Sequence, residues 1–209
     1  MAKRILWTLL VVFAIIIGLY PVIYFVIDKK FGLLSSKGDE LLNSALWNSA
    51  FYIHIVLGGL ALLIGWTQFS AQWRTRKPGV HRLVGKMYVI ACLFSAASGL
   101  YIAFYATGGI IAIAGFSCLG VIWFFTTSMA YDAIKKGRVT IHQKWMIYSY
   151  AACFAAVTLR IWLPLLAMAL HGFIPAYRIV AWLCWVPNIF VAFLIARKKT
   201  LYQSATEAA

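Results

Sequence analysis

The sequence predicts an all-α, polytopic membrane protein with six transmembrane helices. Hydrophobic residues make up 64% of the 209 residues and charged residues only 11%, whereas soluble domains are roughly half apolar and about a quarter charged. The mean hydropathy is +0.86, so a lipid bilayer is expected to surround most of the chain. The apolar residues form continuous runs instead of alternating with polar ones, and this pattern favours helices over a transmembrane β-barrel.

Six apolar runs are long enough to cross a bilayer, for which a helix needs roughly 20 residues. The expected spans cover about residues 5–27, 47–70, 84–106, 110–131, 144–167 and 177–196. Pro21, Pro164 and Pro187 lie inside these runs and are expected to kink their helices. Residues 1–209 are expected to form a single membrane domain.

The charged residues predict the orientation. The chain carries 19 Lys and Arg against 5 Asp and Glu, a formal net charge of +14. Most bases lie before the first run, in the second and fourth connections, and after the last run, whereas the third connection is uncharged and the fifth has only Arg178. The positive-inside rule therefore predicts that both termini are cytoplasmic. We interpret the bases as topology signals and contacts to anionic lipid headgroups on that side, not as a nucleic-acid surface.

The chain also contains an apparent internal repeat. Shifting the sequence by 61 residues without gaps places His81 on His142, and a glycine and an Ala-Cys pair coincide as well. We interpret about 50–105 and 111–166 as a duplicated two-helix hairpin with parallel repeats. A histidine then recurs at the cytoplasmic start of the third and fifth spans.

Two of the four histidines predict a cofactor. Because His81 and His142 share one depth, facing imidazoles there can bind a haem iron from both sides, and haem b is the expected cofactor. Arg82 and Lys86 can hold its propionates by charge-assisted hydrogen bonds. The alternative is that both histidines are interfacial residues that bond lipid phosphate or cap the backbone.

Polar residues in the outer half predict a second site. His54 lies inside the second span, where an ionisable residue is costly and is by default a functional candidate, here as a third iron ligand or a proton-linked switch. Arg160 is deep in the fifth span with no carboxylate in any predicted span, and is expected to share a cavity with His54 that takes a quinone, a haem or a small anion. Gln68 and His171 are further candidates for this polar cavity. The alternatives are that His54 bonds a neighbouring helix and that Arg160 snorkels outward.

Four segments resemble the bacterial predicted membrane proteins of domain of unknown function 2306, over roughly residues 50–165. They are Phe51-Tyr52-Ile53-His54, Gly65-Trp66-Thr67-Gln68-Phe69, His81-Arg82-Leu83-Val84-Gly85-Lys86 and His142-Gln143-Lys144-Trp145-Met146. The resemblance implies a bacterial cytoplasmic (inner) membrane location and no particular reaction. The motif residues that it implies are His54, Gln68, His81, Arg82, His142, Trp145 and Arg160.

A looser resemblance is to two-haem b-type cytochromes, which are similar in carrying histidines on core helices at two depths. This chain departs from them because its fourth span has no histidine to face His54. The inner pair matches, so this resemblance implies one haem.

Three hypotheses of function follow. The first is a haem-binding redox protein that moves electrons across or along the membrane, with a quinone or another redox partner. The second is a cofactor-free, proton-linked transporter of a small solute, and the third is an assembly or scaffold subunit. The chain lacks a phosphate loop, a zinc-protease motif and a paired-acid motif, so a soluble-type hydrolase is not expected, and the sequence leaves open whether the protein is an enzyme. The four cysteines lie in predicted spans without metal-ligand spacing and are expected to be buried thiols.

Overall fold

The computed structural model describes residues 1–27 and 32–207, and every regular element within them is a helix. The all-α prediction is confirmed. The elements are α1 (Ala2–Leu19), η1 (Tyr20–Val22), α2 (Ile23–Val26), η2 (Gly32–Ser36), α3 (Asp39–Leu42), α4 (Ala45–Gly65), η3 (Trp66–Phe69), α5 (Ala71–Arg76), α6 (Pro78–Ala103), α7 (Ile110–Lys135), α8 (Val139–Cys153), α9 (Ala155–Ala169), α10 (Phe173–Leu183) and α11 (Val186–Glu207).

Six stretches of helix are long and apolar enough to cross a membrane, which confirms the predicted number of spans. They are Arg4–Val26, Ala45–Phe69, Pro78–Ala103, Ile110–Lys135, Val139–Ala169 and Phe173–Lys198. The third and fifth spans begin several residues before their apolar runs. Lys and Arg can continue a helix into the interface while their charged ends reach water, so hydropathy alone places these starts too late.

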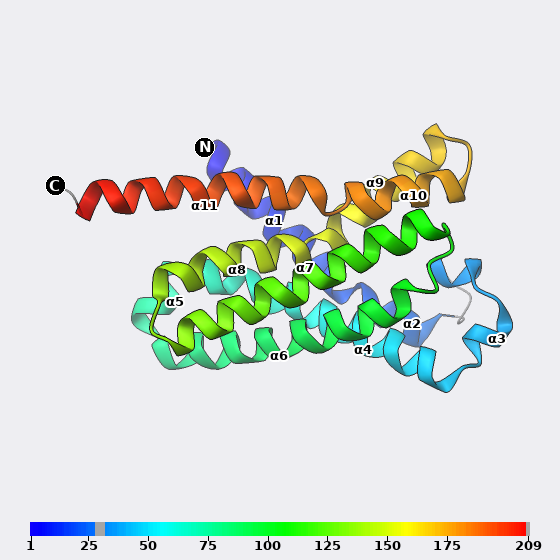
Figure 1. The fold of residues 1–209 in the computed structure, drawn as a ribbon, viewed down its shortest axis with the longest axis horizontal. Helices are drawn as coiled ribbons and strands as arrows, with labels where there is room; N and C mark the ends of the chain where they lie inside the picture. The colour runs from blue at the N-terminus through cyan, green and yellow to red at the C-terminus, as the bar shows by residue number, and fades with distance from the viewer. Residues whose placement is uncertain (28–31, 208–209) are drawn as a thin grey trace.

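Four helices form the centre of the molecule (Figure 1). Helix α4 packs on α6, α6 on α7 and α7 on α8, while α4 also meets α8. Helix α1 covers α4 from outside, and α10 and α11 lie along α7, α8 and α9. Both α4–α6 and α7–α8 are antiparallel hairpins in this bundle, and their origin by duplication stays a prediction.

Small residues and interhelical hydrogen bonds hold the bundle together. A Cβ atom on Gly65 of α4 would lie 2.6 Å from the ring of Tyr150 on α8. The Tyr88 hydroxyl on α6 is 3.0 Å from Ser149 Oγ on α8, which is 2.7 Å from Thr127 Oγ1 on α7. Hydrocarbon does not drive helices together, so close approach and such polar contacts carry the association.

The outer surface of the bundle is apolar. Side chains such as Phe94 and Phe125 are more than half exposed, and large apolar side chains that face outward are expected where lipid is the solvent. The basic α5, the α7–α8 turn and the end of α11 gather at one end of the molecule, with α3 at the other (Figure 1). Which end is cytoplasmic stays a prediction.

The helix is interrupted within three of the spans. Only two of these interruptions lie at a proline that was expected to kink its helix. Pro21 lies in η1 between α1 and α2, and Pro187 follows the break between α10 and α11. The fifth span is interrupted at Phe154, whereas α9 continues through Pro164. The kink expected at Pro164 stays a prediction, and the interruption at Phe154 was not expected. The Thr158 hydroxyl donates to the Cys184 carbonyl, so the interruptions of the fifth and sixth spans are tied to each other.

We expect Gly65→Ala to destabilise the fold by about 1–3 kcal/mol, as overpacking of a tight interior does. The added methyl group would press on the rings of Tyr150 and Tyr88. Thermal unfolding in a mild detergent measures the effect. Gly79→Ala is the matched control, because an added Cβ there meets nothing within 4 Å. Equal unfolding temperatures for the two variants would contradict this account of the α4–α8 contact.

Candidate functional site

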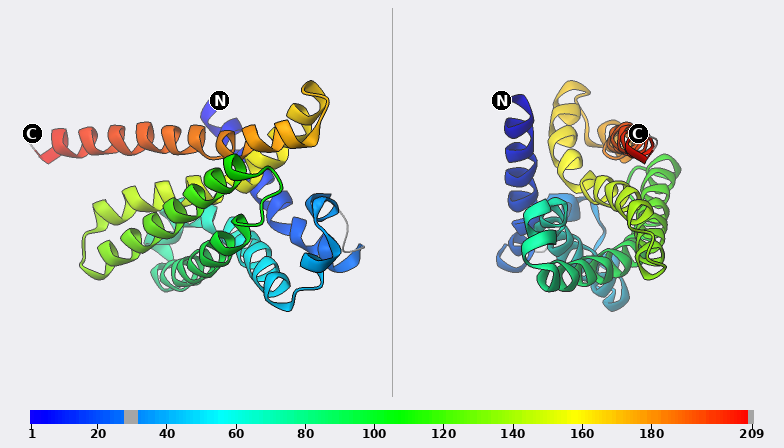
Figure 2. Two further views of the ribbon diagram at one scale, coloured as in Figure 1. Left: turned by 45° about the vertical axis from the view of Figure 1, so that its right-hand side comes forward. Right: turned by 90° about the vertical axis from the view of Figure 1, so that its left-hand side faces the viewer.

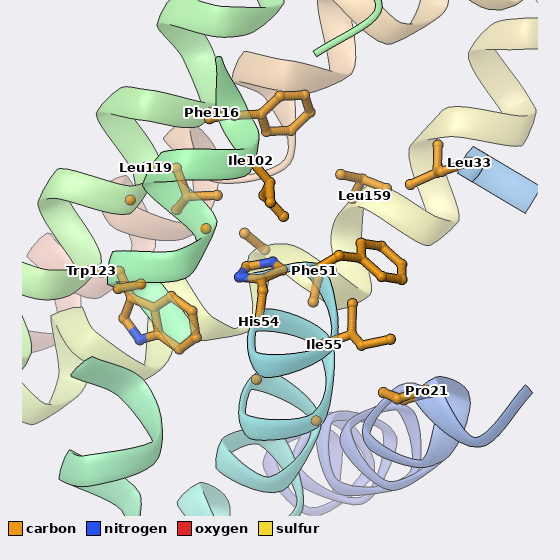
Figure 3. Close-up of a pocket in the computed structure, with 18 of the residues that line it drawn as sticks. Pro21, Leu33, Phe51, His54, Ile55, Ile102, Phe116, Leu119, Trp123 and Leu159 are labelled. Carbon is orange, nitrogen blue, oxygen red and sulfur yellow. The ribbon is translucent and has the colours of Figure 1, made fainter. Parts of the chain in front are cut away.

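A cavity of about 220 Å³ lies in the half of the bundle that faces α3. Its walls come from α1, η2, α4, α6, α7, α8, α9 and α10 and are mostly apolar. Figure 3 shows the wall formed by Phe51, Ile102, Phe116, Leu119 and Trp123 around the imidazole of His54. His54 and Arg160, predicted to share a cavity, both line this one.

The orientation of His54 is fixed by helix α6. Its Nδ1 lies 2.8 Å from the Ser95 carbonyl, which only accepts, so Nδ1 carries a proton and Nε2 is left as the acceptor of the neutral ring. Ser95 Oγ in turn donates to the His54 carbonyl at 2.8 Å. A Cβ on Gly99 would lie 2.7 Å from Nδ1, so glycine makes room for the ring. His54 therefore both binds a neighbouring helix, as the structural alternative expected, and presents an acceptor at the cavity.

Arg160 brings a positive charge to the same cavity. Its Nη1 donates to the Ala156 carbonyl at 3.0 Å, and its guanidinium lies 4.4 Å from the centre of the Tyr20 ring. Among the described residues, the cavity lining contains neither Asp nor Glu. A carbonyl and an aromatic face stabilise the cation only in part. Arg160 and His54 are close enough to interact electrostatically.

Arg160 also lines a second cavity of about 210 Å³. The two cavities share Tyr24, Leu33, Leu159 and Arg160. The second is otherwise lined by Tyr20, Gly32, Leu163, Pro164 and Phe173. The guanidinium therefore stands where the two cavities meet.

The described part of the connection between the first two spans lies at one end of the main cavity. Lys37 Nζ donates to Thr107 Oγ1 at 2.8 Å and also to the Tyr105 carbonyl, and Ser36 Oγ lies 2.9 Å from Thr107 Oγ1. Burial lowers the pKa of the Lys37 ammonium group from its ordinary value. Sequence reasoning missed Lys37 because its loop has balanced charge, and only the fold brings it to the α6–α7 connection.

His81 and His142 lie on the helix faces of α6 and α8 that also bear Tyr88 and Ser149. His81 and Tyr88 are seven residues apart on α6, as are His142 and Ser149 on α8, and positions seven apart share one helix face. Tyr88 and Ser149 hydrogen-bond across the bundle. The helix faces that bear the histidines are therefore opposed two helical turns closer to the α5 end of the molecule. The two imidazoles are also close enough to interact electrostatically.

A tight turn sets the position of His142. Gly137 adopts a left-handed φ of 70°, and the Arg138 N–H donates to the Ala133 carbonyl at 2.9 Å, so the chain reverses directly after α7. The His142 Nδ1 then lies 2.8 Å from the Ala130 carbonyl, which leaves its Nε2 as the acceptor. The His81 Nδ1 is buried and has no hydrogen-bond partner in the structure.

The remaining candidates lie outside both cavity linings. Gln68 is buried at the inner end, where its Nε2 donates to Thr67 Oγ1 at 3.3 Å. His171 is exposed in the α9–α10 turn with a φ of 49°. Arg82 and Lys86 are exposed at the inner end, and Arg82 Nε donates to the Pro78 carbonyl at 3.3 Å. Within residues 1–27 and 32–207, no three or more His, Cys, Asp and Glu gather as a metal-binding group.

The family described as "Predicted membrane protein (DUF2306)" matches residues 51–196. The chain belongs to this family. The match covers three of the six transmembrane helices in full and most of the second and the sixth, and it includes His54, His81, His142 and Arg160. Neither the curated proteins nor the solved structures contain a match to this DUF2306 protein. The likeness to two-haem cytochromes stays a prediction.

We expect Ser95→Ala to lower stability by about 0.6 kcal/mol, the average for an interhelical hydrogen bond in a membrane. The substitution removes the bond from Ser95 Oγ to the His54 carbonyl. Equilibrium unfolding in mixed micelles measures the loss. Ser98→Ala is the control, because Ser98 Oγ bonds only carbonyls of its own helix. A Ser95 variant no less stable than the Ser98 variant would show that this contact does not hold α4 to α6.

Proposed function

We propose that this DUF2306 protein binds a small, mainly apolar molecule with one anionic group and carries it in the membrane in a proton-linked manner. The observation that carries the proposal is the guanidinium of Arg160 at a cavity of about 220 Å³ whose described lining contains no carboxylate. The rest of the lining is predominantly apolar, so the ligand needs an apolar body and a single negative head.

Electrostatics favour an anion over a neutral solute. An uncompensated charge inside a membrane protein costs several kcal/mol, roughly, and a ligand of opposite charge recovers part of that cost. The guanidinium presents N–H groups in a planar fork that matches a carboxylate. Among the described residues, Arg160 donates a hydrogen bond to one protein acceptor, the Ala156 carbonyl.

His54 is suited to take the proton of such a ligand. Ser95 fixes the ring through Nδ1, so Nε2 is the nitrogen that accepts. A weak acid crosses hydrocarbon more readily in its neutral form, and transfer of its proton to Nε2 leaves the anion for Arg160. In a bacterial inner membrane oriented by the positive-inside rule, this cavity lies in the outer half.

The first test is binding of decanoate to the protein in lipid nanodiscs, followed by the fluorescence of Trp47 and Trp123, which line the cavity. Decanol and decylamine are the neutral and cationic comparisons. We expect Arg160→Gln to weaken decanoate binding at least about tenfold, or about 1.4 kcal/mol, because hydrogen bonds to charged groups contribute about 1.5–3 kcal/mol.

Arg178→Gln is the matched control, because Arg178 binds the Gly108 carbonyl and lines neither cavity. Equal binding of decanoate and decanol, or equal losses in the two variants, would overturn the proposal. If His54→Ala lowers only the unfolding temperature while decanoate still binds, a scaffold role for His54 is favoured.

A second candidate function is haem binding at the inner end. The favouring observation is that His81 and His142 are opposed, with the Nδ1 of His142 bound to a carbonyl and its Nε2 left as an acceptor. Iron-binding histidines are usually oriented by such a bond to the other ring nitrogen. His81 and His142 would hold the iron, and Arg82 and Lys86 the propionates. The haem would supply one-electron chemistry, while the chain would set ligation, orientation and burial.

A reduced-minus-oxidised visible spectrum of protein purified from haem-supplied cells tests this candidate. A b-type spectrum is expected, lost in both His81→Ala and His142→Ala because each removes one axial ligand. His171→Ala is the control, since His171 is exposed and remote from the pair. A folded, colourless wild-type protein would exclude the haem candidate and leave the anion proposal standing.

A further inference from the structure

We infer that the ligand is a single-chain lipid anion, such as a long-chain carboxylate, and that it enters sideways from the membrane between α1 and α9. The inference rests on the proposed function above and names its substrate class and route. It is carried by the shape of the main cavity, the position of the second cavity and the contacts of Ser36 and Lys37 with Thr107 at the end that faces α3.

The main cavity is long and narrow. Along α4 its lining extends from Trp47 to Leu62, fifteen residues or about 22 Å of helix at 1.5 Å per residue. A cavity of about 220 Å³ that extends over that length accommodates a ligand with one flexible chain better than a ligand with a flat ring. The part beyond His54 is bordered by Ala96, Trp123 and Cys153, which offer no charge to a ligand.

The second cavity leads from Arg160 to the gap between α9 and the η1–α2 end of the first span. Tyr20 and Tyr24 form the α1–α2 side, and Leu159, Leu163 and Pro164 form the α9 side. Pro164 is exposed and Leu163 half-buried, so this cavity borders on the lipid-facing surface. Figure 2 shows α1 and α9 as neighbours, with α1 in blue and α9 in yellow, and the two helices make few contacts compared with α1 and α4.

Helix α1 is held mainly by its packing on α4 and not by α9. A Cβ on Gly59 would lie 2.6 Å from the Gly18 carbonyl oxygen, so α1 and α4 touch backbone to backbone. On the side that faces α9, the Tyr20 ring packs against the guanidinium of Arg160 at the cavity. An anionic head that binds Arg160 competes with this cation–π contact and can separate the two segments there.

Protein covers part of the end of the main cavity that faces α3. Lys37 and Ser36 bind Thr107 at this end. Beneath them, a buried apolar cluster fills the space between η2, α3 and the start of α4. Its members are Tyr24, Leu34, Leu42, Trp47 and Phe51.

A lipid-soluble ligand gains little from burying its chain, because lipid tails are as apolar as the cavity wall. Discrimination between ligands must therefore come from the contact of the anionic head with Arg160 and from the width of the cavity. Dodecanoate should bind, whereas a fused-ring carboxylate of similar size, such as anthracene carboxylate, should bind at least about tenfold more weakly, a difference of about 1.4 kcal/mol.

Stopped-flow quenching of tryptophan by a bromine-labelled dodecanoate in nanodiscs tests the route. Leu163→Tyr adds bulk to the second cavity only. We expect association and dissociation to slow together by about tenfold, within the range seen among variants of one binding site, with an unchanged Kd. Leu165→Tyr is the matched control, because Leu165 lies on an exposed face of α9 and lines neither cavity.

A second variant separates the two routes independently of the first. Thr107→Ala removes the hydroxyl that binds Lys37 and Ser36, and lateral entry predicts unchanged rates. Faster association in Thr107→Ala, unaltered rates in Leu163→Tyr, or equal affinity for the fused-ring carboxylate would each overturn this inference while binding of decanoate persists. A wild-type protein that binds neither carboxylate would instead overturn the proposed function itself.

Discussion

The hydrocarbon around the six spans offers no hydrogen-bond partner, so each polar group inside them must be satisfied by the protein. This constraint decides how the helices pair. Tyr88, Ser149 and Thr127 join α6, α8 and α7, while Ser95 and His54 join α6 to α4. Each contact needs two helices at short distance, and the glycines and alanines on the facing sides permit that approach.

Arg160 is a charged group that this arrangement satisfies only in part. Its carbonyl and aromatic neighbours provide no opposite charge. Small residues such as Ala96 and Gly99 line the same cavity as Arg160. A cation at the junction of two cavities destabilises the fold, and an anion bound there would offset part of that cost.

The two ends of the bundle are chemically distinct. The outer half contains a cavity with a cation and an imidazole acceptor, and the inner end contains a pair of opposed histidines. The hydrogen-bonded group of Tyr88, Ser149 and Thr127 lies outward of the histidine pair and is fully buried. The proposed anion site and the candidate haem site therefore use separate residues, and one does not require the other.

The sequence by itself determined the number of spans, because hydropathy is a sum over neighbouring residues and the bilayer imposes one length on every helix. It also identified His54 and Arg160, since an ionisable group in a span is expensive wherever its neighbours lie. The tertiary structure alone decided that Lys37 reaches Thr107, that Tyr20 covers Arg160, that the fifth span breaks at Phe154, and that Gln68 and His171 lie away from the cavities. Periodicity assigns a residue to a face of its own helix, but which helix meets that face depends on packing between segments far apart in the chain.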